Sequence, residues 1–385
     1  MATACGGSGA TTRTPSAAPR ASATATAAPA TVAPTPAPAP PQHRVALFGD
    51  GLVDGNGLPD AQSLPYLLAA ARPDLLLLDL GLTYESSDKV LARDRDATEQ
   101  HLDAAVIWVG TYDPAAGSSA QQYAQNMAQL LDDFKGTHVV LLPPVTLPGG
   151  RSAAPYAAAL AQVAAQRGVT VTDISPAMRS ADWQGDGRDL GPNADAALAP
   201  LLEQLLPAPS QPAVAAPPPG ERVVLIGDSL SYGSELDPPQ DLPNQIRALR
   251  PDLDVVDTAV GGQESADALS RLRQFRLLHA DVAVIWIGTQ DADDGVPVAR
   301  FEDNVRRLAA GLAPARIVLA TPIADYSVSA TGFMPYATAT RDLARQLGAT
   351  LVDMGDPPES QYQSDGVHLD AAAEAQAAAE EARAI

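Results

Sequence analysis

The chain has 385 residues, more than one small domain needs and enough for two domains of ordinary size. It carries 25 Lys and Arg against 46 Asp and Glu, and this net charge of −21 disfavours binding to the phosphates of nucleic acids. The single cysteine, Cys5, excludes an intramolecular disulfide framework and a cysteine-based zinc cluster, and the sequence contains no apolar run long enough to span a bilayer.

Residues 1–43 consist almost entirely of Ala, Thr, Pro, Ser and Gly. This composition is too poor in large apolar side chains to fold, so we expect a disordered tether that its prolines make semi-stiff. Cys5, after small residues and before two glycines, resembles the end of a bacterial lipoprotein signal, although the basic and apolar regions are missing and Ala2 stands where leucine is usual. Two interpretations stay open: an extracytoplasmic protein with a lipid on Cys5, or a cytoplasmic protein with an incidental cysteine.

The remainder of the chain is a duplicated domain. A Pro-rich linker, predicted at 207–221, separates residues 44–206 (copy one) from residues 222–385 (copy two). Positions 44–113 and 222–291 align without a gap at a shift of 178 residues and share 30 identical residues in 70. This similarity is far above chance, so we expect the same fold twice.

In each copy, short β-rich runs alternate with amphipathic segments. In copy two the expected strands are 223–226, 254–258, 282–287, 317–320 and 350–352. The expected helices are 242–249, 265–277, 300–312, 336–347 and 370–382. The strands are almost continuously apolar, as parallel strands covered on both faces are. The pattern predicts two tandem flavodoxin-like, three-layer α/β/α domains with parallel sheets, whose function lies at the carboxyl ends of the strands.

Two segments of copy two carry residues suited to nucleophilic catalysis. The first expected strand runs directly into Gly-Asp-Ser-Leu at 227–230, which places Ser229 at the carboxyl edge of the sheet among small neighbours. Asp365 and His368 lie three residues apart with a glycine between them, a spacing that folds the carboxylate back onto the imidazole. Each segment alone is typical of an ordinary turn or surface. Together they indicate a serine nucleophile with a histidine base and an aspartate that orients it.

Copy two resembles the SGNH/GDSL hydrolase family of serine esterases and lipases over essentially its whole length. The segments similar to the family's first, second, third and fifth blocks are 227–230, 256–262, 288–291 and 365–368. The resemblance implies the SGNH hydrolase fold for both copies. It also implies that Ser229 is the nucleophile, His368 the base and Asp365 the acid of a catalytic triad.

The same resemblance implies an oxyanion hole made of the Ser229 and Gly262 amides and the side-chain amide of Gln290. The family has asparagine where Gln290 stands, so the extra methylene puts the position of this donor in doubt. A misplaced donor would lower turnover on the order of 10²–10³ without abolishing it. In the implied reaction, His368 takes the Ser229 proton, Ser229 attacks an ester, and water releases the acyl-enzyme without a metal or organic cofactor.

Copy one departs from this pattern at four of the five equivalent positions. Gly51 replaces the nucleophile, and Tyr84 and Tyr112 replace the two oxyanion positions. Asp186 keeps the place of the acid, but Asp189 stands where the histidine should be. Because loss of the serine or the histidine costs about 10⁶ in turnover, we expect copy one to be inactive. Its tyrosines would then pack in the core or stack on a carbohydrate.

The loop at 322–335 of copy two is two residues longer than its counterpart and contains Tyr326 and Phe333. It is expected to form the rim of the substrate site or to be a plain connection.

We predict a serine esterase of small-molecule or glycan esters with short acyl groups, O-acetyl groups on carbohydrate among them. The alternatives are a tandem carbohydrate-binding or interaction protein with weak or no catalysis, and an O-acyltransferase. The sequence does not determine the oligomeric state.

Overall fold

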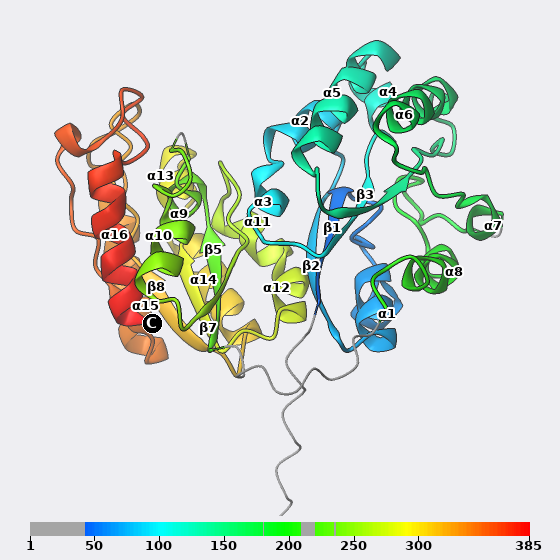
Figure 1. Cartoon of the computed structure of the whole chain (residues 1–385). Helices are drawn as coiled ribbons and strands as arrows, with labels where there is room; N and C mark the ends of the chain where they lie inside the picture. The colour runs from blue at the N-terminus through cyan, green and yellow to red at the C-terminus, as the bar shows by residue number, and fades with distance from the viewer. Residues whose placement is uncertain (1–42, 180, 209–219, 235) are drawn as a thin grey trace, which may run out of the picture. The chain divides into compact units, whose positions relative to one another are not determined.

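The computed structural model describes residues 43–179, 181–208, 220–234 and 236–385. All of these belong to one compact unit that contains both copies (Figure 1). Cys5, the predicted tether up to residue 42 and most of the predicted linker lie outside the described residues. Among the described residues, no helix combines the length and the apolar character needed to cross a membrane.

The described part of copy one is built on four parallel strands in the order β2-β1-β3-β4. The strands are β1 (His43–Asp50), β2 (Leu75–Leu82), β3 (Ala104–Trp108) and β4 (His138–Leu142). The helices are α1 (Leu64–Ala71), α2 (Ser87–Ala92), α3 (Arg95–Thr98), α4 (Asp113–Ala116), α5 (Ala120–Asp133), α6 (Ala154–Arg167), α7 (Ser175–Met178) and α8 (Pro192–Glu203), with a 3₁₀ turn at Asp60–Gln62.

The described part of copy two has five parallel strands in the order β6-β5-β7-β8-β9. They are β5 (Arg222–Gly227), β6 (Asp254–Asp257), β7 (Val282–Trp286), β8 (Arg316–Ala320) and β9 (Thr350–Val352). The helices are α9 (Ser229–Tyr232), α10 (Leu242–Leu249), α11 (Ser265–Ser270), α12 (Leu272–Leu277), α13 (Thr289–Asp293), α14 (Val298–Gly311), α15 (Met334–Leu347) and α16 (Ala371–Ala384), with a 3₁₀ turn at Glu359–Gln361. In copy one, a single parallel bridge between Leu141 and Val171 stands in place of the fifth strand.

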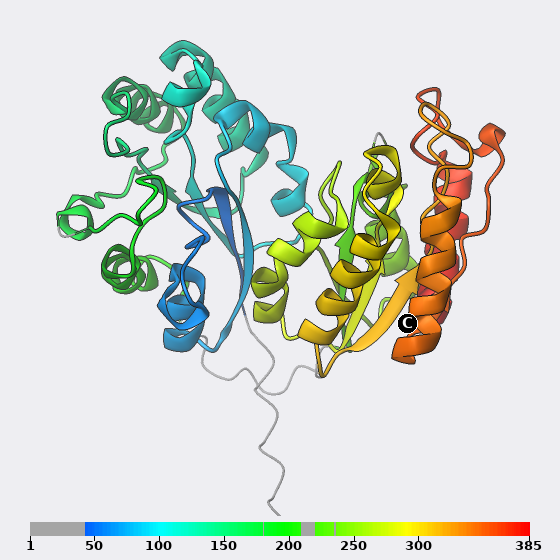
Figure 2. The same cartoon turned by 180° about the vertical axis from the view of Figure 1, so that it is seen from behind.

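Helices cover both faces of each sheet, because successive strand residues point to opposite sides and both sets are apolar. In copy two, α10 and α16 bury one face together with Leu225 and Val284, and α14 and α15 bury the other together with Ile226 and Ile285. Figure 1 views the first of these faces and Figure 2 the second. Copy one is layered in the same way, with α1 and α8 opposite α5 and α6. The predicted pair of three-layer α/β/α domains with parallel sheets is confirmed.

One expected helix is divided, and the division matters for how the copies meet. The pattern predicts a single helix at 265–277, but the structure breaks it at Arg271 into α11 and α12. The Arg271 guanidinium is buried and needs acceptors, which it finds at the Thr258 carbonyl (2.9 Å) and the Gln274 side chain (2.8 Å). Beyond the break, α12 packs on β2 of copy one, and one apolar core runs through both copies.

The two copies contact each other through equivalent residues. Arg273 of α12 donates to the Gly55 carbonyl of copy one at 2.8 Å. Its equivalent, Arg95 of α3, donates to the Asp241 carboxylate of copy two at 3.0 Å. Each copy therefore uses the same element to reach the other, as the subunits of a two-fold symmetric dimer do.

Candidate active site

The candidate nucleophile lies in the turn between β5 and α9, at the carboxyl edge of the sheet. β5 ends at Gly227, where a Cβ would overlap the Ser231 hydroxyl, so a larger residue would distort the turn. Asp228 then caps α9 by accepting a hydrogen bond from the Leu230 amide at 3.0 Å. Ser229 is thereby the first residue of α9 and is partly exposed.

Asp228 shapes this turn from a buried position. Burial raises its pKa to about 7, and Oδ2 has no hydrogen-bond partner among the described residues. Asp50, its equivalent in copy one, is likewise buried, with a pKa raised to about 8, and caps the corresponding turn at the Leu52 amide. Because the copy without a nucleophile keeps the same aspartate, we assign Asp228 to the geometry of the turn.

Asp365 and His368 meet in the loop before α16. Nδ1 of His368 donates to Oδ2 of Asp365 at 2.7 Å, and Oδ1 accepts the amides of Val367 and His368 at 2.9 and 3.1 Å. Gly366 allows the tight turn with a φ of 73°. Burial alone would raise the pKa of Asp365, but the hydrogen bonds from Val367 and His368 outweigh it and hold this pKa below its ordinary value. Nε2 of His368 is buried and has no hydrogen-bond partner among the described residues.

A glutamine that sequence reasoning missed ties the acid–base loop to the nucleophile turn. The Gln363 side chain donates to the carbonyls of Ser234 (3.1 Å) and Leu369 (3.0 Å). The Gln363 amide donates to the His368 carbonyl at 2.7 Å, and the Ser234 amide donates to the Ser229 carbonyl at 3.1 Å. A continuous set of hydrogen bonds therefore links the backbone of the candidate nucleophile to that of the candidate base.

Two predicted oxyanion positions lie outside the nucleophile turn. The residue before the predicted glycine lies next to the nucleophile, whereas the side chain of the predicted glutamine is bonded elsewhere. A Cβ on Gly261 would lie 3.8 Å from the Ser229 Cβ, and the next residue, Gly262, has a φ of 72° with open space where its Cβ would be. The Gln290 side-chain amide donates to Asp294 Oδ2 at 2.7 Å. In this arrangement the Gln290 amide is held along its own helix.

The predicted rim residues have different surroundings. The Tyr326 amide donates to the Gly366 carbonyl at 2.8 Å, and its ring packs edge-on against Tyr362 with centroids 5.0 Å apart. Phe333 is only 4% exposed and lies inside its own loop. Tyr326 therefore supports the acid–base turn, whereas the Phe333 ring is not presented to solvent. A role in substrate contact stays a prediction for this loop.

The equivalent site of copy one is filled. A Cβ on Gly51 would lie 2.9 Å from the Thr83 Cα, so the position is crowded by backbone. Tyr84 adopts a left-handed φ of 63°, close to the 72° of its equivalent Gly262. The rings of Tyr84 and Tyr112 pack edge-on with centroids 5.4 Å apart, Tyr112 being 5% and Tyr84 42% exposed.

The two aspartates of copy one bond to one of these tyrosines. The Tyr84 hydroxyl donates to Asp186 at 3.4 Å and to Asp189 at 3.3 Å, and Asn56 donates to Asp189 at 3.0 Å. Burial, together with the neighbouring carboxyl of Asp186, raises the pKa of Asp189 to about 6. A carboxyl group engaged in this way occupies the place that an imidazole has in copy two.

A protein-family model matches both copies. The model of the GDSL-like lipase/acylhydrolase family matches residues 47–197 and 225–376, one match in each copy. Because the two matches cover most of the chain, the chain belongs to this family. The resemblance inferred from the motifs is confirmed.

Solved structures with similarity to the chain include lipases and esterases. A lipase/acylhydrolase from Enterococcus faecalis is 20% identical over 42% of this chain and 94% of its own, with a TM-score of 0.39. The esterase EstA from Pseudoalteromonas sp. is 18% identical over 42% and 94%, with a TM-score of 0.37. A catalytic mutant of an acetylxylan esterase from Geobacillus stearothermophilus is 18% identical over 43% and 92%, with a TM-score of 0.35. No curated protein matches the sequence.

Proposed function

We propose that copy two is a serine esterase that hydrolyses carboxylic esters with short acyl groups and that copy one takes no part in bond cleavage. The acid–base pair carries the proposal. Asp365 holds Nδ1 of His368 at 2.7 Å, whereas Nε2 is buried with no hydrogen-bond partner among the described residues. An imidazole oriented in this way by a carboxylate is suited to accept a serine proton through its other nitrogen.

In the proposed reaction, Nε2 of His368 takes the proton from Ser229 Oγ while Oγ attacks the ester carbonyl. The amides of Ser229 and Gly262 donate to the oxyanion. His368 then returns the proton to the departing alcohol oxygen. A water molecule, deprotonated by the same nitrogen, attacks the acyl-enzyme and releases the acid and the free serine. Asp365 keeps the imidazole in the required tautomer and stabilises its protonated form.

Labelling with a fluorophosphonate probe, which forms a bond only to an activated serine, tests the nucleophile. We expect one adduct, on Ser229, and none within 44–206. Ser229→Ala should lose both the adduct and the hydrolysis of p-nitrophenyl acetate. Ser152→Ala, at an exposed serine of copy one, should keep both. A protein that neither reacts nor hydrolyses short-chain esters, but binds glycans specifically, would establish a binding module instead.

An extracytoplasmic location with a lipid on Cys5 is a separate part of the proposal. It rests on the sequence around Cys5 alone, since this residue lies outside the described part of the chain. Growth with a radioactive fatty acid should label the native protein and leave Cys5→Ser unlabelled. Equal labelling of both, or of neither, would remove the lipid from the proposal.

A further inference from the structure

A cavity of about 540 Å³ lies between the two copies, beside the nucleophile of copy two. Copy two contributes Gly261 and Gly262 to its wall, and copy one contributes the end of β2 and the side chain of Lys89. A Cβ on Gly261 would lie 3.8 Å from the Ser229 Cβ. The glycine segment that lines the cavity is therefore also the neighbour of the residue that the proposed reaction acylates.

The two copies line this cavity with equivalent segments. Four lining residues of copy one match four of copy two at the repeat shift. The pairs are Leu82 and Val260, Thr83 and Gly261, Glu85 and Gln263, and Lys89 and Asp267. The segment that supplies an oxyanion amide in one copy thus faces its inactive counterpart in the other. At the last pair, copy one offers an ammonium group where copy two offers a carboxylate.

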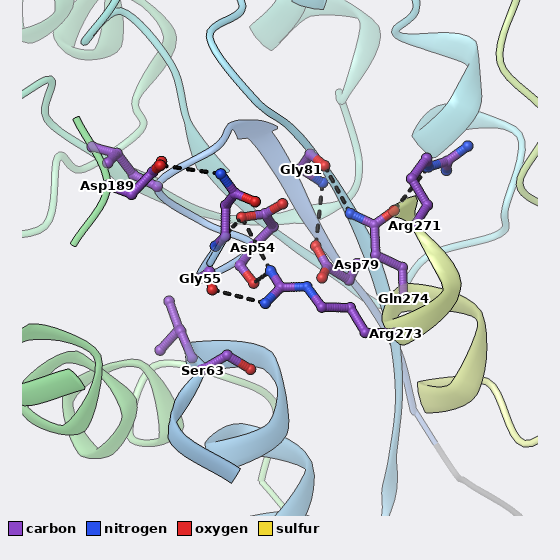
Figure 3. A network of polar contacts seen from close by, with 12 residues as sticks. Asp54, Gly55, Ser63, Asp79, Gly81, Asp189, Arg271, Arg273 and Gln274 are labelled. Atoms are coloured by element: carbon purple, nitrogen blue, oxygen red, sulfur yellow. Dashed lines mark hydrogen bonds and ion pairs between the residues drawn. The ribbon is translucent and has the colours of Figure 1, made fainter. Parts of the chain in front are cut away.

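Contacts from two residues of copy two hold the wall from copy one in place (Figure 3). The Arg273 guanidinium forms an ion pair with the Asp54 carboxylate at 3.2 Å and donates to the carbonyls of Asp54 and Gly55. Next to it, the Gln274 side chain donates to the Gly81 carbonyl of β2 at 2.9 Å. The Arg273 contacts are charge-assisted, and breaking the buried Gln274 bond would leave a buried carbonyl without a partner, so both oppose displacement of this wall.

The cavity is hydrophilic. Of its sixteen lining residues, all from the described part of the chain, only Leu82 and Val260 are aliphatic and none is aromatic. An alkyl chain would therefore gain little by leaving water for this space. The Lys89 side chain is exposed and makes no hydrogen bond or ion pair with a described residue. The Asp267 carboxylate accepts the Glu264 amide at 3.2 Å and has no cationic partner among the described residues. A ligand entering the cavity meets a donor on one side and an acceptor on the other.

We propose that copy one forms one wall of the substrate site of copy two, and that the hydroxyl-rich alcohol part of the ester binds between the copies with Lys89 as a specificity-determining residue. This inference rests on the proposed esterase function. A short acyl group fills only a small part of 540 Å³, which leaves the space to the alcohol. Hydroxyl groups both donate and accept hydrogen bonds, so they match the ammonium of Lys89 and the carboxylate of Asp267.

The kinetic test compares two acetate esters of six-carbon alcohols, 6-O-acetylglucose and hexyl acetate, on the full chain. Wild type should have the higher kcat/KM for the sugar ester. Lys89→Met keeps the length of the side chain and removes the charge. It should lower the ratio of the two kcat/KM values about tenfold, mainly through KM for the sugar ester. The only other lysine, Lys135, lies outside the cavity, and Lys135→Met should leave the ratio unchanged. An unchanged ratio in Lys89→Met would overturn the proposal.

A second measurement does not depend on turnover. In Ser229→Ala, an amine-reactive N-hydroxysuccinimide ester should acylate Lys89 more slowly when 6-O-acetylglucose is present, and Lys135 at the same rate with or without it. Equal labelling of Lys89 in both conditions refutes binding between the copies, whether or not the protein is an esterase. Protection of Lys89 in a protein whose wild type has no esterase activity refutes the proposed function and leaves the sugar site standing.

Discussion

The acid–base loops of the two copies have the same backbone scaffold and different chemistry. In copy two, the Gln363 side chain donates to the carbonyls of Ser234 and Leu369. In copy one, the Gln184 side chain donates to the carbonyls of Asn56 and Leu190 in the same pattern. A scaffold kept in the copy without a nucleophile shows that these hydrogen bonds serve the fold of the loop.

The difference lies in the residues that the scaffold carries. Asp186 accepts the backbone amides two and three residues after it, just as Asp365 does. At the third residue, copy one has the carboxyl group of Asp189 bonded to Tyr84, whereas copy two has His368, which keeps a nitrogen without a partner among the described residues. The backbone of this loop is therefore kept even where the side chain that would act as base is replaced.

The largest effect should come from breaking the acid–base pair in only one copy. Asp365→Asn replaces the acceptor of Nδ1 with a group that favours the wrong tautomer, so we expect kcat for p-nitrophenyl acetate to fall about 10³–10⁴-fold. The equivalent change in copy one, Asp186→Asn, is the matched control and should leave kcat unchanged. A similar loss in both variants would show that the effect is structural, and no loss in Asp365→Asn would remove this residue from the mechanism.

The second largest effect concerns stability. It distinguishes the terminal helix of copy two from that of copy one. Glu381 of α16 is fully buried with both oxygens unpartnered among the described residues, whereas its equivalent in α8 is the core residue Leu202. Burial raises the pKa of Glu381 to about 8, above the 4.5 of the unfolded chain. The unfolded chain therefore loses this proton first, and the free energy of unfolding falls as the pH rises from about 4.5 to about 8, in total by about 3–5 kcal/mol.

Glu381→Leu, which gives α16 the residue of α8, removes this titration. We expect urea unfolding at pH 8.5 to show a stabilisation of about 3–5 kcal/mol over wild type, with a much smaller difference at pH 4.5. Glu380→Gln, at a neighbouring carboxylate paired with Arg383 near the surface, is the control and should not change the pH dependence. A gain that is independent of pH would mean that Glu381 is ionised in the folded protein.

The third prediction restores a serine to copy one. In Gly51→Ser the new Cβ must displace the Thr83 backbone, which lies 2.9 Å away, so we expect a loss of about 1–3 kcal/mol in stability. Combined with Ser229→Ala, it should give no ester hydrolysis, because Asp189 stands where the base is needed. Urea unfolding of the single variant and p-nitrophenyl acetate turnover of the double variant check the two parts. Measurable activity in the double variant would contradict the assignment of copy one as inactive.

The sequence was informative where the structure depends on local patterns. The repeat, the strands and the pairing of Asp365 with His368 can be predicted from periodicity and a three-residue spacing. The break at Arg271 could not, because it depends on acceptors such as the Thr258 carbonyl that only the folded chain supplies. The cavity between the copies depends on how α12 docks on β2, which no local pattern encodes. Gln363 could have been noticed, since Gln184 precedes the same motif in copy one.

The smallest effect concerns the predicted oxyanion position that copy two fills with Gln290 and copy one with Tyr112. Gln290 donates to Asp294 four residues later, a spacing that brings side chains together along a helix. In Gln290→Asn the shorter amide no longer reaches Asp294 and can turn towards the oxyanion, so we expect kcat to rise about three- to tenfold with little change in KM. Asp294→Ala frees the glutamine without shortening it and should give a smaller rise. If both variants keep the wild-type kcat for p-nitrophenyl acetate, the backbone amides of Ser229 and Gly262 hold the oxyanion without help from this side chain.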